Sequence, residues 1–266
     1  MEAALLEFRD ISKSFGSIYA LRGVSLRVAK GEVVALLGDN GAGKSTLIKI
    51  LSGVHAPDSG EILVRGERVQ HWNAAKARQS GIETVYQDKA LAEQQSVVRN
   101  IFMGRERANR LGFLKLREER EEAERLMRHI GFTSQVFSPE SEVGRLSGGE
   151  REGVAIARAL YFNAELIILD EPTSALSLTE ARRVIEFVKR ARDDGASAIF
   201  ITHTIYHAYD VADRIVVLDR GEIVLEIEKA AIGVEELIAR MEGIARHGKH
   251  GTVDGGVDRG DARRSD

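Results

Sequence analysis

A glycine-rich loop occupies residues 38–46 of the chain and reads Gly38-Asp39-Asn40-Gly41-Ala42-Gly43-Lys44-Ser45-Thr46. It follows the apolar run Val33 to Leu37, which is typical of a buried strand, and it precedes a helical pattern that ends near Gly53. The spacing fits the pattern GxxxxGK(S/T) in the strand, loop and helix context that this pattern requires. The sequence therefore predicts a phosphate-binding loop between a strand and a helix.

Each residue type in this loop has a chemical reason to be there. Glycines let the backbone curl so that successive N–H groups point at phosphate oxygens, and the start of the following helix adds its positive dipole end. Lys44 supplies a positive charge for the β- and γ-phosphates, and the hydroxyl of Ser45 can ligate Mg²⁺. A chance match of a glycine-rich turn is the alternative, and the preceding strand weighs against it. We expect a nucleoside triphosphate to bind here.

Two acidic residues end a second apolar run. Leu166 to Leu169 indicates a buried strand, and Asp170 and Glu171 follow it directly. In a parallel sheet whose first loop holds phosphates, such carboxylates lie where they can organise a metal and accept a proton from water. We assign the metal role to Asp170 and the role of general base to Glu171. Without the glycine-rich loop, a solvated strand end would be the preferred interpretation of this pair.

The order of the apolar runs predicts an α/β fold, and the phosphate-binding loop makes it one of the P-loop NTPase kind. Helical patterns separate several runs, which is typical of a mainly parallel core sheet, and shorter strands joined by turns predict an N-terminal antiparallel sub-domain. The core strands are expected at 33–37, 82–86, 166–169, 198–201 and 215–218, and the N-terminal ones at 5–8, 23–28 and 60–64.

The composition is that of an ordinary globular chain. Lys and Arg number 38 and Asp and Glu 41 in 266 residues, a net charge of −3, so no broadly basic surface points to nucleic acid as a partner. The chain has no cysteine, which excludes disulfides, thiolate metal sites and cysteine nucleophiles. No stretch approaches the ~18 consecutive apolar residues of a membrane-spanning helix, and the acidic N-terminus is unlike a signal peptide. We expect any membrane role to come through a partner.

The middle and the end of the chain differ from the rest. A helix predicted over 115–130 places five apolar side chains on one face, namely Leu116, Ala123, Leu126, Met127 and Ile130. Residues 245–266 contain five glycines and alternating charges and cannot bury enough apolar surface to offset their ordering entropy. We therefore expect one globular domain over 1–244, a helical sub-domain inserted in it at about 90–160, and a disordered tail over 245–266.

A third motif makes a family resemblance specific. It reads Leu146-Ser147-Gly148-Gly149-Glu150, and together with the glycine-rich loop and the strand acids it resembles the motif set of the ATP-binding cassette (ABC) ATPases. The resemblance extends to about residue 244 and implies ATP and Mg²⁺ as ligands. It also implies a homodimer in the ATP-bound state, in which each ATP lies on one subunit's phosphate loop and is covered by the partner's residues 147–150.

The same resemblance implies roles for further residues. Gln87, at the end of the strand expected over 82–86, would contact Mg²⁺ or the attacking water and sense a membrane partner. His203 would hydrogen-bond the γ-phosphate, and Phe15 holds the place of the aromatic residue that stacks on adenine. His207 lacks the motif position, so we predict a structural role for it.

Three longer segments, 81–88, 100–106 and 153–161, look like those of ATP-binding subunits of simple-sugar importers. This likeness implies a peripheral subunit at the cytoplasmic face of the cell membrane that powers import through a separate permease, with a solute-binding protein as an indirect partner and no nucleic acid. Four apolar residues would either line a groove for the permease or pack in the core: Leu91, Val97, Ile101 and Phe102.

Two positions depart from the family pattern. Glu150 replaces the usual signature glutamine, and it also completes a capping-box pattern with Ser147; Ser177 replaces the usual acid after the strand acids. Three alternatives stay open: an ABC-type ATPase acting on nucleic acid or ribosomes, an importer of a non-sugar solute, and a regulatory module without hydrolysis. The short interval between Gln87 and Ser147 weighs against the first, and intact Glu171 and His203 weigh against the last.

Overall fold

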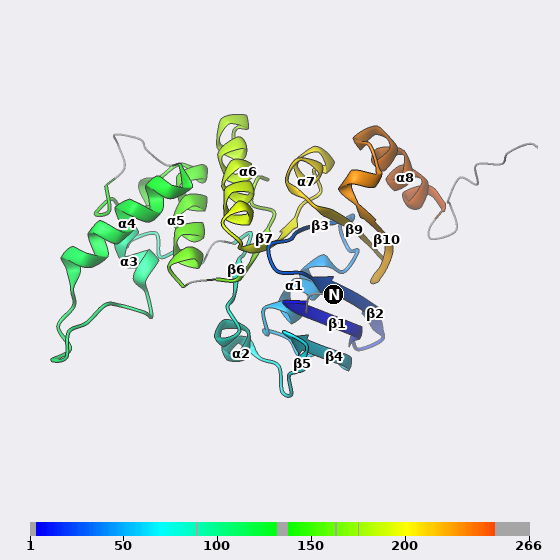
Figure 1. The fold of residues 1–266 in the computed structure, drawn as a ribbon, viewed down its shortest axis with the longest axis horizontal. Helices are drawn as coiled ribbons and strands as arrows, with labels where there is room; N and C mark the ends of the chain where they lie inside the picture. Colours follow the sequence, from blue (N-terminus) through cyan, green and yellow to red (C-terminus); the bar gives the residue numbers. More distant parts are fainter. Residues whose placement is uncertain (1–3, 89, 132–137, 163, 175, 248–266) are drawn as a thin grey trace, which may run out of the picture.

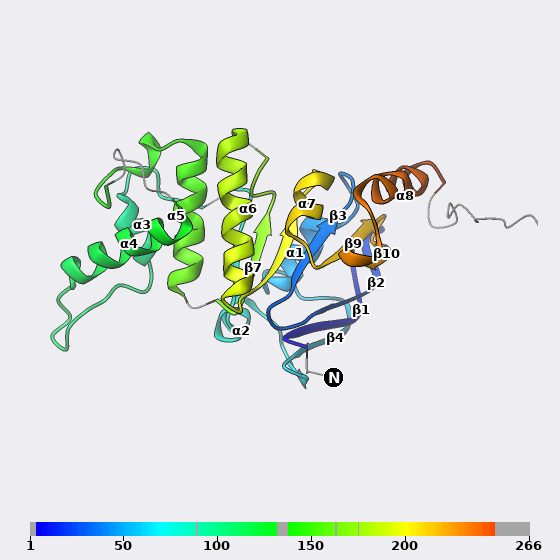
Figure 2. The same cartoon turned by 45° about the horizontal axis from the view of Figure 1, so that its top comes forward.

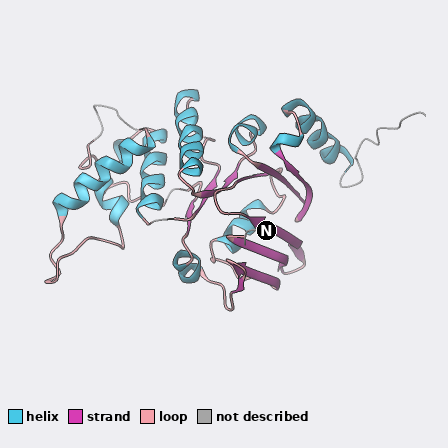
Figure 3. Ribbon diagram, viewed as in Figure 1, coloured by secondary structure: helices cyan, strands magenta, loops and turns pink. Residues whose placement is uncertain are grey.

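The computed structural model describes the chain except for residues 1–3, 89, 132–137, 163, 175 and 248–266. Within the described residues the strands are β1 (Leu6–Phe15), β2 (Ile18–Val28), β3 (Val33–Leu37), β4 (Ser59–Val64), β5 (Glu67–Arg68), β6 (Ile82–Val85), β7 (Leu166–Asp170), β8 (Ser197–Ile201), β9 (Arg214–Asp219) and β10 (Glu222–Glu228). They form a four-stranded sheet in the order β2-β1-β4-β5 and a six-stranded sheet in the order β10-β9-β3-β8-β7-β6 (Figure 3).

The helices cover the six-stranded sheet on both faces. They are α1 (Lys44–Leu51), α2 (Ala74–Gln79), α3 (Val97–Phe102), α4 (Leu116–Ile130), α5 (Gly148–Tyr161), α6 (Leu178–Asp193), α7 (Ile205–Val211) and α8 (Val234–His247), with short 3-10 turns η1 (Val143–Arg145) and η2 (Lys229–Ala231). Figure 1 shows α6, α7 and α8 along one face of this sheet and α1 with the four-stranded sheet on the other. In both views, α3, α4 and α5 group together at one end of the molecule (Figures 1 and 2).

The six-stranded sheet is parallel except at one edge. β6, β7, β8, β3 and β9 pair in parallel, whereas β10 pairs antiparallel with β9. Strands that are covered on both faces are apolar throughout, and every residue of Val33–Leu37 is buried. The predicted α/β fold, with a mainly parallel core sheet and an N-terminal antiparallel sheet, is confirmed.

The four-stranded sheet is larger than predicted. β1 continues to Phe15 and β2 begins at Ile18, although the sequence predicted strands only over 5–8 and 23–28. The additional parts are largely exposed or half-buried, so no regular apolar alternation marks them in the sequence. β5 and β10 were not predicted for a similar reason: β5 has two exposed residues, and β10 has no fully buried one.

The helices α3, α4 and α5 share an apolar core with the neighbouring strands. Val97, Ile101 and Phe102 are at most 1% exposed, and Leu91 packs partly buried against the same cluster. These residues belong to the core, so of the two alternatives that the sequence left open, core packing is confirmed and a groove for a permease is not.

The helix predicted over 115–130 is α4, with one correction to its buried face. Ala123, Met127 and Ile130 are buried as expected and Leu126 is partly buried, but Leu116 is 55% exposed. Glu119 is buried instead, and its carboxylate accepts a 2.7 Å hydrogen bond from the backbone N–H of Arg107. A buried glutamate that accepts a hydrogen bond from a backbone N–H cannot be found from hydrophobic spacing alone.

The last helix, α8, continues to His247 and so enters the segment 245–266 for which we predicted disorder. Leu237 is buried and Met241 partly buried in a cluster with β9 and α7, which explains why the helix runs this far. The rest of the predicted tail lies outside the described residues. No helix in the described part of the chain combines the length and apolar character that a membrane crossing requires.

Candidate functional site

The glycine-rich loop joins β3 to α1 and borders a cavity of about 770 Å³. The loop therefore has the strand and helix context that the sequence predicted. The cavity is also lined by the start of β2 and by the carboxyl ends of the parallel strands, where ligands of such sheets bind. Its lining residues are Ile18, Tyr19, Ala20, Asp39, Asn40, Gly41, Gly43, Lys44, Ser45, Thr46, Gln87, Asp170, Glu171 and His203.

Two glycines of the loop are required by close backbone approach. At Gly38 (φ +155°) a Cβ would lie 2.3 Å from the carbonyl oxygen of Leu218, and at Gly43 (φ +109°) it would lie 2.6 Å from the carbonyl oxygen of Ala20. Neither contact leaves room for a side chain, and both φ angles disfavour L-residues. The loop thus adopts its curled form while packed directly against the backbone of two other segments.

The side chain of Lys44 stabilises the curled conformation of the glycine-rich loop. Its Nζ donates hydrogen bonds to the carbonyl oxygens of Gly38 at 2.6 Å and Asp39 at 3.0 Å. The ammonium group therefore lies in the hollow of the loop, where its charge faces the cavity. This is the position from which a lysine can balance the charge of a polyphosphate.

Two carboxylates enter the cavity from the end of β7. Burial and the neighbouring carboxylate of Glu171 raise the pKa of Asp170, while the charge of Lys44 and a hydrogen bond from the backbone N–H of Gln87 act in the opposite direction. The contact with Gln87 joins the ends of β6 and β7, which are neighbours in the sheet. The parallel register thus brings Gln87 and Asp170 together from distant parts of the sequence.

Glu171 has a positive φ angle, and its side chain is held in place by a hydrogen bond to His203. Its φ angle is +51°, which is strained for a residue with a side chain, and its N–H donates to the carbonyl oxygen of Ile201 at 2.9 Å. Oε1 of its carboxylate lies 2.9 Å from Nδ1 of His203, whereas Oε2 is buried and has no hydrogen-bond partner among the described residues. A buried carboxylate oxygen with an unused acceptor site can accept a proton or a hydrogen bond from a bound molecule.

The cavity also offers oxygen ligands of the kind that Mg²⁺ prefers. The carboxylate of Asp170, the hydroxyl of Ser45 and the side-chain amide of Gln87 all line it. The described residues contain no group of three or more His, Cys, Asp or Glu side chains that could hold a metal ion. The donor set therefore fits a magnesium ion that is bound partly by protein and partly by phosphate and water, as is usual for this ion.

The signature residues form the start of α5. Ser147 is its N-cap, and Glu150 completes the predicted capping box: Ser147 Oγ accepts from the N–H of Glu150 at 3.2 Å, and Glu150 Oε2 accepts from the N–H of Ser147 at 2.9 Å. Residues 147–150 do not line the phosphate-loop cavity of their own subunit. This separation agrees with a site that two subunits would share.

Sequence reasoning missed Glu180, the third residue of α6, which contacts the signature motif. Its Oε1 accepts hydrogen bonds from the hydroxyl of Ser147 at 2.9 Å and from the N–H of Gly149 at 3.2 Å. A Ser177 to Glu180 capping-box pattern predicts the local cap of α6. No local pattern, however, indicates a contact with residues 147–149.

Two other predicted residues lie apart from the cavity. Phe15 is 48% exposed, packs edge-on against His55 with a ring separation of 5.6 Å, and is not among the lining residues, whereas Ile18 and Tyr19 are. His207 Nδ1 lies 3.0 Å from Oγ1 of Thr173, on a distant segment of the chain, and His207 is not among the lining residues; its structural role stays a prediction.

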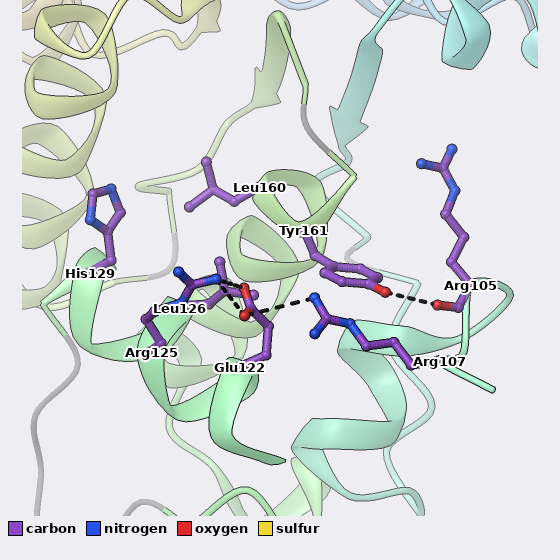
Figure 4. Close-up of a pocket in the computed structure, with 8 residues that line it drawn as sticks. All are labelled: Arg105, Arg107, Glu122, Arg125, Leu126, His129, Leu160 and Tyr161. Carbon is purple, nitrogen blue, oxygen red and sulfur yellow. Dashed lines mark hydrogen bonds and ion pairs between the residues drawn. The ribbon is translucent and has the colours of Figure 1, made fainter. Parts of the chain in front are cut away.

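A second cavity, of about 660 Å³, lies between α4 and the end of α5 (Figure 4). Its arginine side chains are engaged by neighbours: Glu122 pairs with Arg125 and, at 3.8 Å, with Arg107, and the guanidinium of Arg105 pairs with Glu83 at 3.6 Å. It contains neither a glycine-rich turn nor a strand-end carboxylate. The phosphate-loop cavity is therefore the candidate nucleotide site.

Comparisons with known proteins agree with this choice. Residues 21–174 match the family described as ABC transporter. The chain is 48% identical over 243 residues to the xylose/arabinose import ATP-binding protein of Sulfolobus acidocaldarius, covering 91% of this chain and 95% of that protein. It is 40% identical over 239 residues to a ribose import ATP-binding protein of Yersinia pestis, covering 90% of this chain and 46% of that protein, so it spans about half the length of this relative.

Solved structures give the same result. A nucleotide-free ATP-binding cassette from an ABC transporter superposes with a TM-score of 0.76 at 27% identity, covering 91% of this chain and 96% of that chain. A bacterial ABC transporter cassette described as dimeric superposes with a TM-score of 0.74 at 26% identity, covering 84% of this chain and 98% of that chain.

Proposed function

This chain belongs to the ABC transporter family, and we propose that it is the ATP-hydrolysing subunit that powers import of a simple sugar through a separate membrane permease. The 48% identity to a xylose/arabinose import ATP-binding protein over nearly the full length of both chains carries this proposal. An action on nucleic acid or ribosomes has no support in either relative, because both are import subunits.

The geometry around Glu171 supports hydrolysis rather than binding alone. His203 holds one carboxylate oxygen at 2.9 Å, which fixes the orientation of the group and leaves the buried Oε2 for a water molecule. We assign to Glu171 the task of orienting this water and accepting its proton, and to His203 a hydrogen bond to the γ-phosphate. A non-hydrolysing regulatory module would have no need for this pair.

We assign the other residues that would contact ATP and Mg²⁺ by their position around the cavity and in the signature motif. Residues 38–46 would cradle the phosphates of ATP, and Ser45, Gln87 and Asp170 would hold Mg²⁺, which supplies positive charge beside the β- and γ-phosphates when bound. Ser147, Gly148, Gly149 and Glu150 would cover the ATP of a second subunit. The exposed Phe15 is retained as the adenine contact, with Tyr19 as the aromatic residue that already lines the cavity.

The permease would contact a surface beside Gln87, which would place the subunit peripherally at the cytoplasmic face of the membrane. A hollow of about 290 Å³ there is lined by exposed Val54 and Met103 together with Tyr86, Arg158 and Phe162. It takes the place of the groove that the sequence offered, as an alternative to core packing, for Leu91, Val97, Ile101 and Phe102. Because Tyr86 directly precedes Gln87, a partner seated here would lie next to the nucleotide cavity.

The test is reconstitution with the permease and the solute-binding protein in proteoliposomes. We expect ATP hydrolysis and uptake of a pentose to rise together, and we expect both to be lost in Glu171→Gln. Uptake of an amino acid or metal ion instead of any sugar would contradict the assigned substrate class. A complete protein set without ATPase activity would contradict the enzymatic role.

A further inference from the structure

Glu180 lies where α6 meets the signature motif and uses both of its carboxylate oxygens. Oε2 accepts hydrogen bonds from the N–H and the hydroxyl of Ser177 at 3.0 Å and 2.8 Å, which caps α6. Oε1 accepts from the hydroxyl of Ser147 and the N–H of Gly149 at 2.9 Å and 3.2 Å. One carboxylate therefore joins the start of α6 to the start of α5.

The two groups that donate to Oε1 of Glu180 each have a single hydrogen. A hydroxyl and a backbone N–H can each direct only one hydrogen at an acceptor, so Ser147 and Gly149 cannot fully serve Glu180 and a phosphate at the same time. The contact is also close: a Cβ at Gly149 would lie 2.5 Å from Oε1 of Glu180. The absence of a side chain at this position is what allows the carboxylate to approach.

We propose that Glu180 is an internal counter-ligand of the signature motif, an anion of the same chain that occupies the donors intended for the γ-phosphate of the partner subunit's ATP. This inference rests on the proposed function, in which Ser147 and Gly149 contact that phosphate. Closing the dimer then requires Ser147 and Gly149 to exchange the carboxylate for the phosphate. The exchange makes closure weaker and more reversible than it would be with free donors.

Protonation does not release this contact at working pH. Hydrogen bonds from the side chain and backbone of Ser177, and further ones from Ser147 and Gly149, lower the pKa of Glu180 to about 2. The carboxylate is therefore ionised whenever ATP is bound near neutral pH. Only a competing anion, such as a phosphate brought by the partner subunit, can take its place.

The experiment measures ATP-driven dimerisation in a Glu171→Gln background, where hydrolysis does not interfere. Adding Glu180→Gln keeps the shape but weakens the acceptor, so we expect the ATP concentration for half-maximal dimerisation to fall by about 5-fold or more, the effect of one charge-assisted hydrogen bond. Binding of a fluorescent ATP analogue to the isolated subunit should not change, because Glu180 is not part of the phosphate-loop cavity. Amide exchange at Gly149 in the ATP-free subunit should become faster.

Two controls separate the carboxylate contact from charge and from helix capping. Glu186→Gln removes an exposed charge from the same helix. Ser177→Ala removes the N-cap of α6 but leaves the carboxylate of Glu180 in place. Neither variant should tighten dimerisation. Unchanged or weaker dimerisation in Glu180→Gln, or equal tightening in Ser177→Ala, would overturn the proposal that Glu180 is a counter-ligand. If Glu171→Gln alone does not dimerise with ATP, the proposed function fails. The contact is then tested separately by amide exchange in the ATP-free subunit: an unchanged rate at Gly149 in Glu180→Gln would overturn it.

Discussion

Nδ1 of His203 lies 2.9 Å from Oε1 of Glu171, which joins the residues that follow two neighbouring parallel strands, β8 and β7. The histidine is 64% exposed at its side chain and the glutamate only 12%. The carboxylate is thus held from its solvent side, while its second oxygen stays buried. The hydrolytic assignment depends on this arrangement.

Glu171→Gln should bind ATP normally and lose at least ~100-fold in turnover, because the amide keeps the shape but cannot accept a proton. The variant should accumulate as an ATP-bound dimer, detectable by size-exclusion chromatography. Glu186→Gln serves as the control for an exposed glutamate. Turnover within a few-fold of the parent would remove Glu171 from the role of base.

His203→Ala should reduce turnover by roughly 10- to 100-fold, the effect of losing a hydrogen bond to a charged group. His207→Ala is the matched control, because His207 is hydrogen-bonded to Thr173 and does not line the cavity. Steady-state ATPase assays of both variants test this. Equal losses in the two variants would show that the motif position of His203 carries no special role.

Gly38→Ala should lower the free energy of unfolding by at least ~2 kcal/mol and abolish nucleotide binding, because strain adds to a backbone clash. The new Cβ would lie 2.3 Å from the carbonyl oxygen of Leu218. Gly16→Ala is the control, since Gly16 has φ +61° with nothing within 4 Å, so only strain of ~1 kcal/mol is expected. Urea denaturation and nucleotide titration measure both effects, and equal destabilisation would contradict the clash.

Glu150→Gln should slightly lower thermal stability while tightening ATP-driven dimerisation. The carboxylate caps Ser147 at 2.9 Å and favours the positive end of α5, yet it repels the triphosphate of the partner. Both effects should stay at ~1 kcal/mol or less because the site is screened by solvent. Dimerisation measured at low and high salt should depend less on salt in the variant, and an unchanged or weaker dimer would make Glu150 a neutral replacement.

Glu180 should make stability depend on acid pH. Its pKa falls from an ordinary 4.5 to about 2 in the folded chain, so the stabilisation is complete above about 4.5 and is lost as the pH falls towards 2. Above about pH 4.5 the parent chain should therefore have a larger free energy of unfolding than Glu180→Gln, and this difference should shrink as the pH falls towards 2. Because Glu180 is partly exposed, the difference should stay below ~1 kcal/mol, and denaturation at several pH values tests its sign.

The sequence predicted those features that depend on short motifs and on strands buried on both faces. The loop at Gly38 and the acids at Asp170 lie at the ends of fully apolar strands, so pattern and position agree. Glu180 was missed because its contact with Ser147 depends on how α5 and α6 pack, which no local spacing encodes. The sequence left open whether Phe102 packs in the core or lines a groove, because apolar residues of a core and of a docking groove have the same periodicity.

The phosphate loop is also a junction of three distant segments. The N–H of Gly221, in the turn between β9 and β10, donates to the carbonyl oxygen of Ala42, while its own carbonyl oxygen accepts from the N–H of Arg22 on β2. Segments at the beginning and near the end of the chain are thus fastened to the same loop. A fragment restricted to the family-matched span, 21–174, would contain the loop but neither β9 nor its turn. The candidate nucleotide site is consequently a property of the whole fold. Splitting the chain after Ser174 should dismantle it, even though every residue of the phosphate loop and both strand acids would remain in the first piece.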